Sequence, residues 1–340
     1  MKSFSACIKD IAVYLPEAIL GNDELAKLYP DWPAEKIFEK TGISERRVAG
    51  KNQTAGDMAY EAARNLFAQG QIALRDVDFI LLCTQAPDYI LPTTACLLQD
   101  RLGVSRYAGA LDINLGCSGF VYGLSLAKGL IESGAARCIL LLTSDTYSKY
   151  IHPLDKSVRT LFGDAAAATA IVASEDQEGA IGPFVFGTDG SGAKHLIVEA
   201  GMSRLPKSGD TLVEHIDGFE NVRGRENLYM DGAEVLSFSL KEVPKAVDAL
   251  LQKTGKSKDE IDYFVLHQAN RFMLESLRKK IKIPKEKLPV EIENCGNTVS
   301  STIPMMLFKL MSQGKLQRGQ RLMLVGFGVG YSWAACLLIF

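Results

Sequence analysis

Short apolar runs recur along the chain, and each is bounded by Gly, Pro or Asp. They are too short for helices, and apolar runs without polar alternation are typical of strands that are buried on both faces. We therefore predict buried strands at residues 79–83, 138–142, 264–266 and 322–325.

Longer segments between these runs carry apolar residues at helical spacing. A chain in which such helices alternate with buried strands is typical of the α/β fold class. We predict the helices at residues 54–69, 119–132, 235–254 and 271–281.

The two halves of the chain share a weak internal repeat. The stretch VDFILLCTQA at 77–86 corresponds to IDYFVLHQA at 261–269, and DINLGCSGF at 112–120 corresponds to EIENCGNTV at 291–299. The offsets agree closely, because 261 minus 77 is 184 and 297 minus 117 is 180. This agreement predicts a duplication, whose halves are residues 1–175 and 176–340.

Two segments depart from this pattern. Residues 186–232 are irregular and rich in Gly and charged residues, so we predict a long loop excursion, a feature that is often functional. Residues 322–340 carry no charge, but Gly326, Gly328 and Gly330 interrupt them, so we expect two buried strands joined by a turn rather than a membrane helix. Only ten residues follow these glycines, too few for a dinucleotide-binding βαβ unit.

Composition and charge narrow the classes of function. The 340 residues include 40 acidic and 38 basic side chains, a formal charge of −2, whereas nucleic-acid binders concentrate excess Lys and Arg. The seven cysteines lack paired spacing and mostly lie in apolar runs, which indicates reduced thiols. Lys9 and Asp10 interrupt the first apolar stretch and argue against a signal peptide, so we expect a cytoplasmic protein. Four histidines and no CxxC motif give no obvious set of metal ligands.

Cys117 is the first candidate for catalytic chemistry. It lies between glycines in LGCSGF, directly before a predicted helix. The unpaired N–H groups and the dipole at a helix start favour the thiolate, which is the nucleophilic form. The alternative is a small buried apolar residue without a chemical role.

His267 and Asn297 are the other candidates. His267 directly follows a predicted strand, and functional groups gather at the carboxyl ends of strands in α/β sheets, although a structural histidine is the alternative. Asn297 alone indicates only a turn. The internal repeat, however, places Cys117 and Asn297 at equivalent helix starts, so we predict that both face one shared pocket.

A series of motifs spans nearly the whole chain: YLPE (14–17), TGI with ERR (41–47), LPTTAC (91–96), GCSGF (116–120), LFGDAAAA (161–168), MDGAEV (230–235), HQAN (267–270), CGNTVSS (295–301) and GFGVGYSW (326–333). In order and separation they resemble the β-ketoacyl-acyl carrier protein synthase III family of the thiolase superfamily. The resemblance implies a thiolase-like five-layered αβαβα fold made of two duplicated halves, and a homodimer. It also implies an acyltransferase of fatty-acid biosynthesis that uses coenzyme A or acyl carrier protein thioesters as substrates and no other cofactor.

The resemblance assigns roles to residues of the site. It implies that Cys117 accepts the acyl group, and that His267 and Asn297 donate hydrogen bonds to the enolate formed when a malonyl thioester loses carbon dioxide. The enolate then attacks the acyl group and extends it by two carbons. The backbone N–H groups of Cys117 and Val329 would form the oxyanion hole. The implied walls of the substrate pocket are Phe162, Phe327 and Leu91, the last of which would cross the dimer interface.

The residues expected to contact the carrier depart in part from the family pattern. A Trp that stacks on the adenine of coenzyme A is expected five residues before TGI, where this chain has Lys36, and the nearest Trp is Trp32. We therefore expect acyl-coenzyme A to be a weak substrate unless Trp32 reaches the same place. The other contacts predicted for coenzyme A or an acidic carrier protein are Lys156, Arg271, Lys279 and Lys280.

Three alternatives stay open at this point. One is a related acyltransferase or specialised-metabolite ketosynthase that acts on an unusual primer or a non-carbon nucleophile. Another is a non-catalytic companion that binds an acyl chain or a partner subunit. The third is a papain-like protease, because 150 residues separate Cys117 from His267 and an Asn follows, although the local pattern around the Cys differs.

Overall fold

The computed structural model describes residues 4–175 and 180–340, and all of the predicted strands and helices are present in it. Strand β4 (Phe79–Cys83) and helix α5 (Gly119–Glu132) coincide with the predicted ranges. Strand β6 (Cys138–Asp145) continues to residue 145 rather than 142, because the polar residues at its end are also buried.

Two mixed β-sheets form the core of the described chain. Their other strands are β1 (Ser5–Tyr14), β5 (Gly109–Ile113), β7 (Ala165–Ser174), β8 (Ile181–Thr188), β13 (Tyr263–Leu266), β14 (Arg321–Gly328) and β15 (Ser332–Ile339). The first sheet has the order β1-β7-β6-β4-β5, and the second has the order β13-β14-β15-β8. Each sheet therefore draws its strands from one half of the sequence.

The strand directions confirm the predicted duplication. In the first sheet β4 is parallel to β6, which is antiparallel to β7, which is antiparallel to β1. The second sheet repeats this pattern in β13, β14, β15 and β8. Edge strand β5 has no counterpart, because residues 288–294 form no strand. The division between the halves was predicted after residue 175. Residues 176–179 lie outside the described residues, so the exact position of this division stays a prediction.

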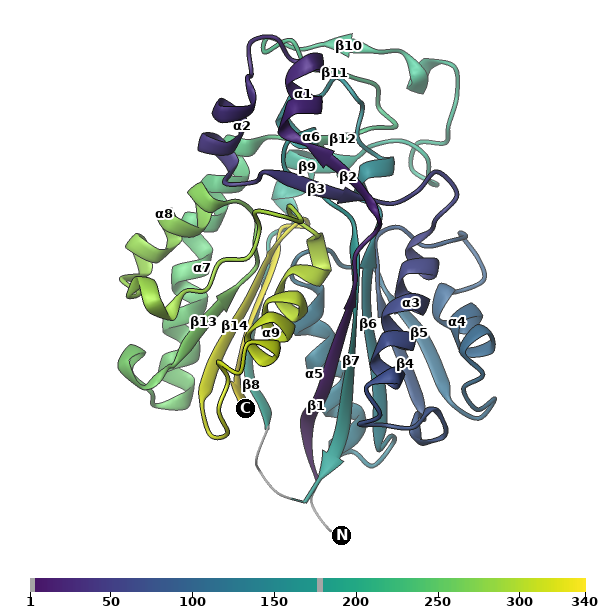
Figure 1. Cartoon of the computed structure of the whole chain (residues 1–340), viewed down its shortest axis with the longest axis vertical. Coiled ribbons are helices and arrows are strands. Elements are labelled where there is room, and N and C mark those ends of the chain that lie inside the picture. Colours follow the sequence, from purple (N-terminus) through teal and green to yellow (C-terminus); the bar gives the residue numbers. More distant parts are fainter. Residues whose placement is uncertain (1–3, 176–179) are drawn as a thin grey trace.

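The sheets and helices form five layers, which stand side by side in Figure 1. Helices α3 (Ala55–Ala68) and α4 (Thr94–Leu102) pack on the first sheet, and α7 (Gly232–Thr254), joined by α8 (Arg271–Ile281), packs on the second. Helices α5 and α9 (Thr302–Ser312) contact strands of both sheets and form the central layer. This is the αβαβα arrangement that the resemblance implies.

Helix α5 shows why the helices of the central layer have strongly apolar sequences. It lies between two sheets, so both of its faces must be apolar, and Phe120, Val121 and Leu124 are all fully buried. A Cβ on Gly123 would lie 2.7 Å from a methyl carbon of Leu141 in β6, so the glycine permits close packing of this helix on the first sheet.

Short elements cover the upper end of the sheets in Figure 1. They are β2 (Ala18–Gly21), α1 (Asn22–Leu28), α2 (Ala34–Thr41), β3 (Glu45–Val48), α6 (Lys156–Arg159), β9 (Leu196–Val198), β10 (His215–Ile216), β11 (Val222–Arg223) and β12 (Leu228–Met230). The expected excursion at 186–232 supplies four of these strands, although its first residues belong to β8 and its last residue begins α7. Short 3-10 turns lie at Leu74–Asp76, Tyr147–Lys149, Gly190–His195, Asp210–Leu212, Lys258–Glu260, Lys285–Lys287 and Val299–Ser301.

The uncharged C-terminal stretch forms two strands, β14 and β15, joined by a tight turn, as predicted. Within residues 4–175 and 180–340, no helix is long and apolar enough to cross a lipid bilayer.

Gly163 lies where segments from the two halves touch. Its N–H donates to the carbonyl of Asn297 at 3.0 Å, and a Cβ on Gly163 would lie 2.1 Å from the carbonyl oxygen of Cys295. Backbone atoms cannot move aside as a flexible side chain can, so this contact requires a glycine.

We expect Gly163→Ala to lower the free energy of unfolding by about 1–3 kcal/mol, the usual cost of overpacking. Gly129→Ala is a matched control, because Gly129 lies inside α5 with open space around its Cα, and alanine there should stabilise the helix by roughly 0.5–1 kcal/mol. Urea unfolding measures both changes. Equal stability of the two variants would contradict the proposed contact.

Candidate active site

Cys117 lies in the turn between β5 and α5, on the inner side of the second sheet. The hairpin of β14 and β15 packs against this turn so closely that a Cβ on Gly326 would lie 2.8 Å from the Cys117 carbonyl oxygen. A Cβ on Gly328 would lie 3.1 Å from the Cys117 Sγ. Gly326 and Gly328 of the GFGVG stretch therefore permit close backbone packing around the sulfur.

His267 follows the last residue of β13 and is 2% exposed. Its backbone N–H donates to the carbonyl of Val325, and its ring Nδ1 forms a 2.7 Å hydrogen bond with the hydroxyl of Thr302. Burial lowers the pKa of the imidazole to about 3, because nothing compensates a positive charge there. The ring is therefore neutral near pH 7.

Asn297 is held by backbone bonds to the first half of the chain. Its N–H donates to the carbonyl of Leu161, its carbonyl accepts from Gly163, and Asn297 pairs with Phe162 in an isolated parallel bridge. The side-chain Oδ1 accepts the N–H of Val299 at 2.9 Å, so the amide nitrogen is left as a hydrogen-bond donor.

One cavity of about 310 Å³ brings these side chains together. Its lining includes Cys117, His267 and Asn297, together with the predicted wall residues Phe162 and Phe327. The prediction that Cys117 and Asn297 face one pocket is therefore confirmed. The more exposed lining residues, which mark the side open to solvent, include Trp32 and Lys40.

The state of the Cys117 thiol differs from the expectation. Burial raises its pKa well above the usual range of a thiol, and the carboxylate of Asp145 raises it further. A helix start contributes only about 0.3–1 kcal/mol, which does not offset complete burial. The expectation that the position alone favours a thiolate is wrong for the unliganded site, where the sulfur keeps its proton.

Asp145 is a buried carboxylate that the sequence analysis missed. Its oxygens accept the N–H of Gln85 at 2.8 Å and the hydroxyl of Ser300 at 2.5 Å. Burial raises the pKa of this carboxyl to about 7, although these hydrogen bonds act in the opposite direction. Asp145 thus ties the ends of β4 and β6 to the segment that follows Asn297.

The residues of the implied oxyanion hole lie close to the cavity, whereas the implied pocket residue Leu91 does not. Among the described residues, no backbone carbonyl accepts from the N–H groups of Cys117 and Val329. The side chain of Val329 packs beside Gly116, and a Cβ on Gly116 would lie 2.8 Å from a methyl carbon of Val329. Leu91 is 80% exposed and lies outside the lining of the cavity.

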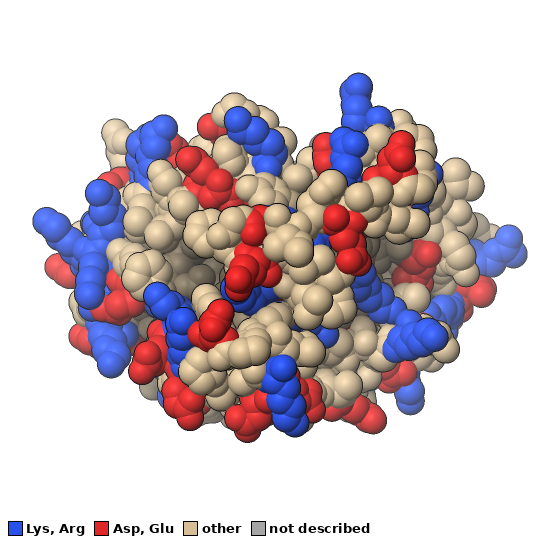
Figure 2. Space-filling view, turned by 90° about the horizontal axis from the view of Figure 1, so that it is seen from above, with Lys and Arg blue, Asp and Glu red and all other residues tan. Residues whose placement is uncertain are grey.

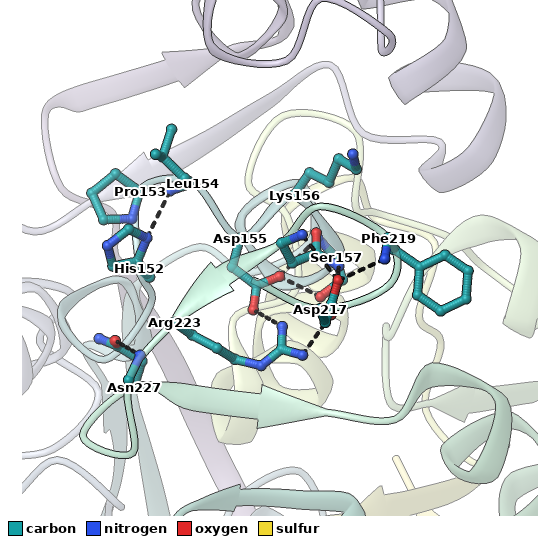
Figure 3. Close-up of polar contacts among 12 residues, drawn as sticks. His152, Pro153, Leu154, Asp155, Lys156, Ser157, Asp217, Phe219, Arg223 and Asn227 are labelled. Carbon is teal, nitrogen blue, oxygen red and sulfur yellow. Dashed lines mark hydrogen bonds and ion pairs between the residues drawn. The ribbon is translucent and has the colours of Figure 1, made fainter. Parts of the chain in front are cut away.

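Lys156 lies at the start of α6, beside an ion-pair network that Figure 3 shows. Arg223 donates to the buried Asp155 at 2.8 Å and to Asp217 at 2.6 Å, and so joins the β10–β11 arm to α6. The Lys156 side chain is only 15% exposed and lies 3.9 Å from Glu220 of the same arm. Lys156 itself does not line the cavity, whereas its neighbour Ser157 does.

The basic residues of α8 lie at the surface. Arg271 already forms an ion pair with Glu293 at 3.1 Å, and Lys279 lies 3.7 Å from Glu275, whereas no ion pair within the described residues holds Lys280. In the view from above, blue side chains gather along the left margin, the side on which Figure 1 places α2 and α8, and acidic side chains lie among them (Figure 2). The patch is basic but partly neutralised.

Trp32 lies closer to the cavity than its position in the sequence suggested. It lines the cavity together with Lys40 and Thr41, and the ammonium group of Lys36 lies 5.4 Å from the centre of its ring. An aromatic side chain therefore lies at the cavity although position 36 holds a lysine.

A chain that combines this five-layered fold with a buried thiol, a neutral imidazole and an amide around one cavity is a condensing acyltransferase of the thiolase fold. Residues 111–190 match the family described as 3-oxoacyl-[acyl-carrier-protein (ACP)] synthase III, and residues 251–340 match its C-terminal domain. The chain belongs to the 3-oxoacyl-[acyl-carrier-protein] synthase III family.

Full-length relatives support this assignment. The beta-ketoacyl-[acyl-carrier-protein] synthase III of Caldanaerobacter subterraneus subsp. tengcongensis is 34% identical over 99% of this chain and 98% of its own length. A synthase III of Halalkalibacterium halodurans is 37% identical over 99% and 97%. These relatives do not favour a protease, a non-catalytic companion or a specialised-metabolite enzyme.

Solved structures confirm the fold class. A crystal structure of a 3-oxoacyl-(acyl-carrier-protein) synthase III superposes with a TM-score of 0.98 at 66% identity, covering 99% of this chain and 100% of that one. The corresponding synthase of Burkholderia xenovorans LB400 gives a TM-score of 0.91 at 36% identity, covering 100% and 95%.

We expect iodoacetamide at a stoichiometric amount to label Cys117 in preference to Cys295. Cys295 is also buried, which raises its pKa to about 12, but its Sγ contacts two backbone carbonyls and lies outside the cavity lining. Cys117 opens on the cavity, and the rate of its alkylation should keep rising with pH beyond the range of an ordinary thiol. Peptide mass spectrometry measures the site of labelling and its rate at each pH. Label mainly on Cys295 would contradict the assignment of Cys117 as the nucleophile.

Proposed function

We propose that this protein transfers an acyl group from a thioester to Cys117 and then condenses it with a malonyl thioester, as a 3-oxoacyl-[acyl-carrier-protein] synthase III. The observation that carries the proposal is the single cavity lined by Cys117, His267 and Asn297 in a member of this family. The chemistry needs a nucleophile, donors for a developing oxyanion and donors for an enolate.

The first half-reaction is thioester exchange. The Cys117 sulfur attacks the acyl carbonyl, and the N–H groups of Cys117 and Val329 hold the oxyanion. The tetrahedral intermediate expels the carrier thiolate, which takes up the proton that the Cys117 sulfur loses. Burial raises the pKa of this thiol in the empty site, so the sulfur loses its proton in the course of the attack.

The second half-reaction breaks one carbon–carbon bond and forms another. The carboxylate of a malonyl thioester leaves as carbon dioxide, and its bonding electrons form an enolate. The neutral His267 and the Asn297 amide donate hydrogen bonds to the enolate oxygen. The enolate carbon attacks the acyl group on Cys117 and expels the sulfur, which regains a proton from solvent, and the product is two carbons longer.

The carriers and the assembly belong to the same proposal. Basic side chains on α8 favour an acidic carrier protein. Trp32 at the cavity removes the main reason to expect a weak coenzyme A donor.

The exposed side chains of Tyr89, Ile90 and Leu91 support a homodimer in which Leu91 reaches the partner's site. We place the enzyme in the cytoplasm, with no cofactor beyond its thioester substrates; the lack of paired spacing among the cysteines in the sequence supports that location.

Replacing His267 or Asn297 with Ala should separate the half-reactions. Each change removes one donor to the enolate, so decarboxylation of the malonyl thioester should fall by about a hundredfold or more. Acylation of Cys117 should persist, because neither side chain contributes to the oxyanion hole. Release of labelled carbon dioxide measures the first step and the mass of the Cys117 peptide the second. Normal decarboxylation by the Asn297 variant would show that the enolate site lies elsewhere.

Reversing charge on α8 tests the docking face. The double change Lys279→Glu and Lys280→Glu should raise KM for a carrier-protein thioester about tenfold at low salt, because surface charges act mainly on association. The KM for the same acyl group on coenzyme A should stay within twofold. Lys315→Glu, a single charge reversal at an exposed position after α9, is the control, and it should leave both KM values unchanged. Equal losses with both donors would place the docking face elsewhere.

A further inference from the structure

Within the part of the chain that the structure describes, the hydroxyl of Thr302 is the one hydrogen-bond partner of the His267 ring. Thr302 is the first residue of α9, is 3% exposed, and lies 2.7 Å from Nδ1 of His267. The same hydroxyl can also donate to the carbonyl of Val299 at 3.2 Å, and because a hydroxyl carries one proton, this carbonyl competes with Nδ1 for it. The other ring nitrogen, Nε2, has no hydrogen-bond partner among the described residues, so it is the nitrogen left for a ligand in the cavity.

A neutral imidazole carries one proton, on either Nδ1 or Nε2, and the group bonded to one nitrogen decides what the other can do. When a hydroxyl donates to Nδ1, the proton lies on Nε2 and that nitrogen is a donor. When the hydroxyl instead accepts from Nδ1, Nε2 has only a lone pair. The buried position of His267 keeps the ring neutral, so the choice between these two states determines its role.

The enolate proposed above requires a donor on Nε2, because an imidazole lone pair would repel the enolate oxygen. We infer that Thr302 is a positioning residue whose hydroxyl donates its one proton to Nδ1 of His267 at 2.7 Å rather than to the more distant carbonyl of Val299, and thereby fixes the Nε2–H form facing the cavity. The inference rests on the proposed function. No proton is transferred in this contact, since the hydroxyl keeps its proton while sharing it.

The surrounding segment explains why the hydroxyl is held in place. Between Asn297 and α9, Ser300 donates to Asp145, and the hydroxyl of Ser301 lies 2.9 Å from that of Thr143. These contacts anchor the segment to the end of β6. Asn297 and Thr302 therefore lie on the same anchored segment. Because Thr302 contacts His267, this segment also fixes the position of His267 relative to Asn297, the other proposed donor to the enolate.

Two substitutions at one position separate the hydroxyl from the methyl group. Thr302→Val keeps the shape of the side chain and removes the hydroxyl, whereas Thr302→Ser keeps the hydroxyl and removes the methyl. We expect the Val variant to lose roughly tenfold to a hundredfold in malonyl decarboxylation, less than the loss of the imidazole itself. We expect the Ser variant to stay within about threefold of the unchanged protein. Acylation of Cys117, measured by mass spectrometry, should persist in both.

Nitrogen NMR of the protein with ¹⁵N-labelled histidine gives a readout that simple loss of packing would not produce. The two ring nitrogens resonate at different shifts according to which carries the proton, and His267→Gln identifies the His267 signals among the four histidines. We expect Nε2–H in the unchanged protein and in Thr302→Ser, and a shift toward Nδ1–H in Thr302→Val.

Three outcomes would overturn the inference: Nδ1–H in the unchanged protein, normal decarboxylation by Thr302→Val, or loss in Thr302→Ser with activity in Thr302→Val. The proposed function fails separately. It fails if no thioester acylates Cys117 in the unchanged protein, or if His267→Ala decarboxylates normally.

Discussion

The backbone bridge between Phe162 and Asn297 holds the two sides of the site in register. The N–H of Asn297 and the N–H of Gly163 each bond across it, and Gly163 leaves room for the Cys295 carbonyl. These bonds fix a residue of the second half beside a wall residue of the first. The cavity between the halves, and therefore the relation of Cys117 to His267 and Asn297, depends on this contact.

Burial then determines the electrostatics of the site. It keeps the His267 imidazole neutral and the Cys117 sulfur protonated, and it makes the buried Asp145 carboxylate costly unless its oxygens are hydrogen bonded. A neutral imidazole and an amide can donate to an enolate without transferring a proton to it. The same buried surroundings would strengthen the proposed oxyanion hole, because its N–H groups would compete with little water.

Periodicity in the sequence predicted the strands and helices, and the internal repeat predicted that Cys117 and Asn297 face one pocket, whereas the five-layered fold was implied by the family resemblance. Buried strands such as β4 appear as unbroken apolar runs, and the repeat related the turn of Cys117 to that of Asn297. It failed where the answer depends on distance through space. The sequence offers no signal that Asp145 is buried beside Ser300, and it left open whether Trp32, in the turn before α2, reaches the cavity. Thr302 follows Asn297 by five positions in a Ser/Thr-rich stretch, which indicated a helix start but not a bond to His267.

The most direct test of the account follows the mass of Cys117 through one turnover. Incubation with an acyl thioester should add the mass of the acyl group to the peptide that contains Cys117. Addition of a malonyl thioester should then return that peptide to its original mass and release carbon dioxide, while the carrier gains an acyl group two carbons longer. A product formed without a covalent intermediate on Cys117, or an acylated Cys117 that malonyl thioester does not discharge, would contradict the account.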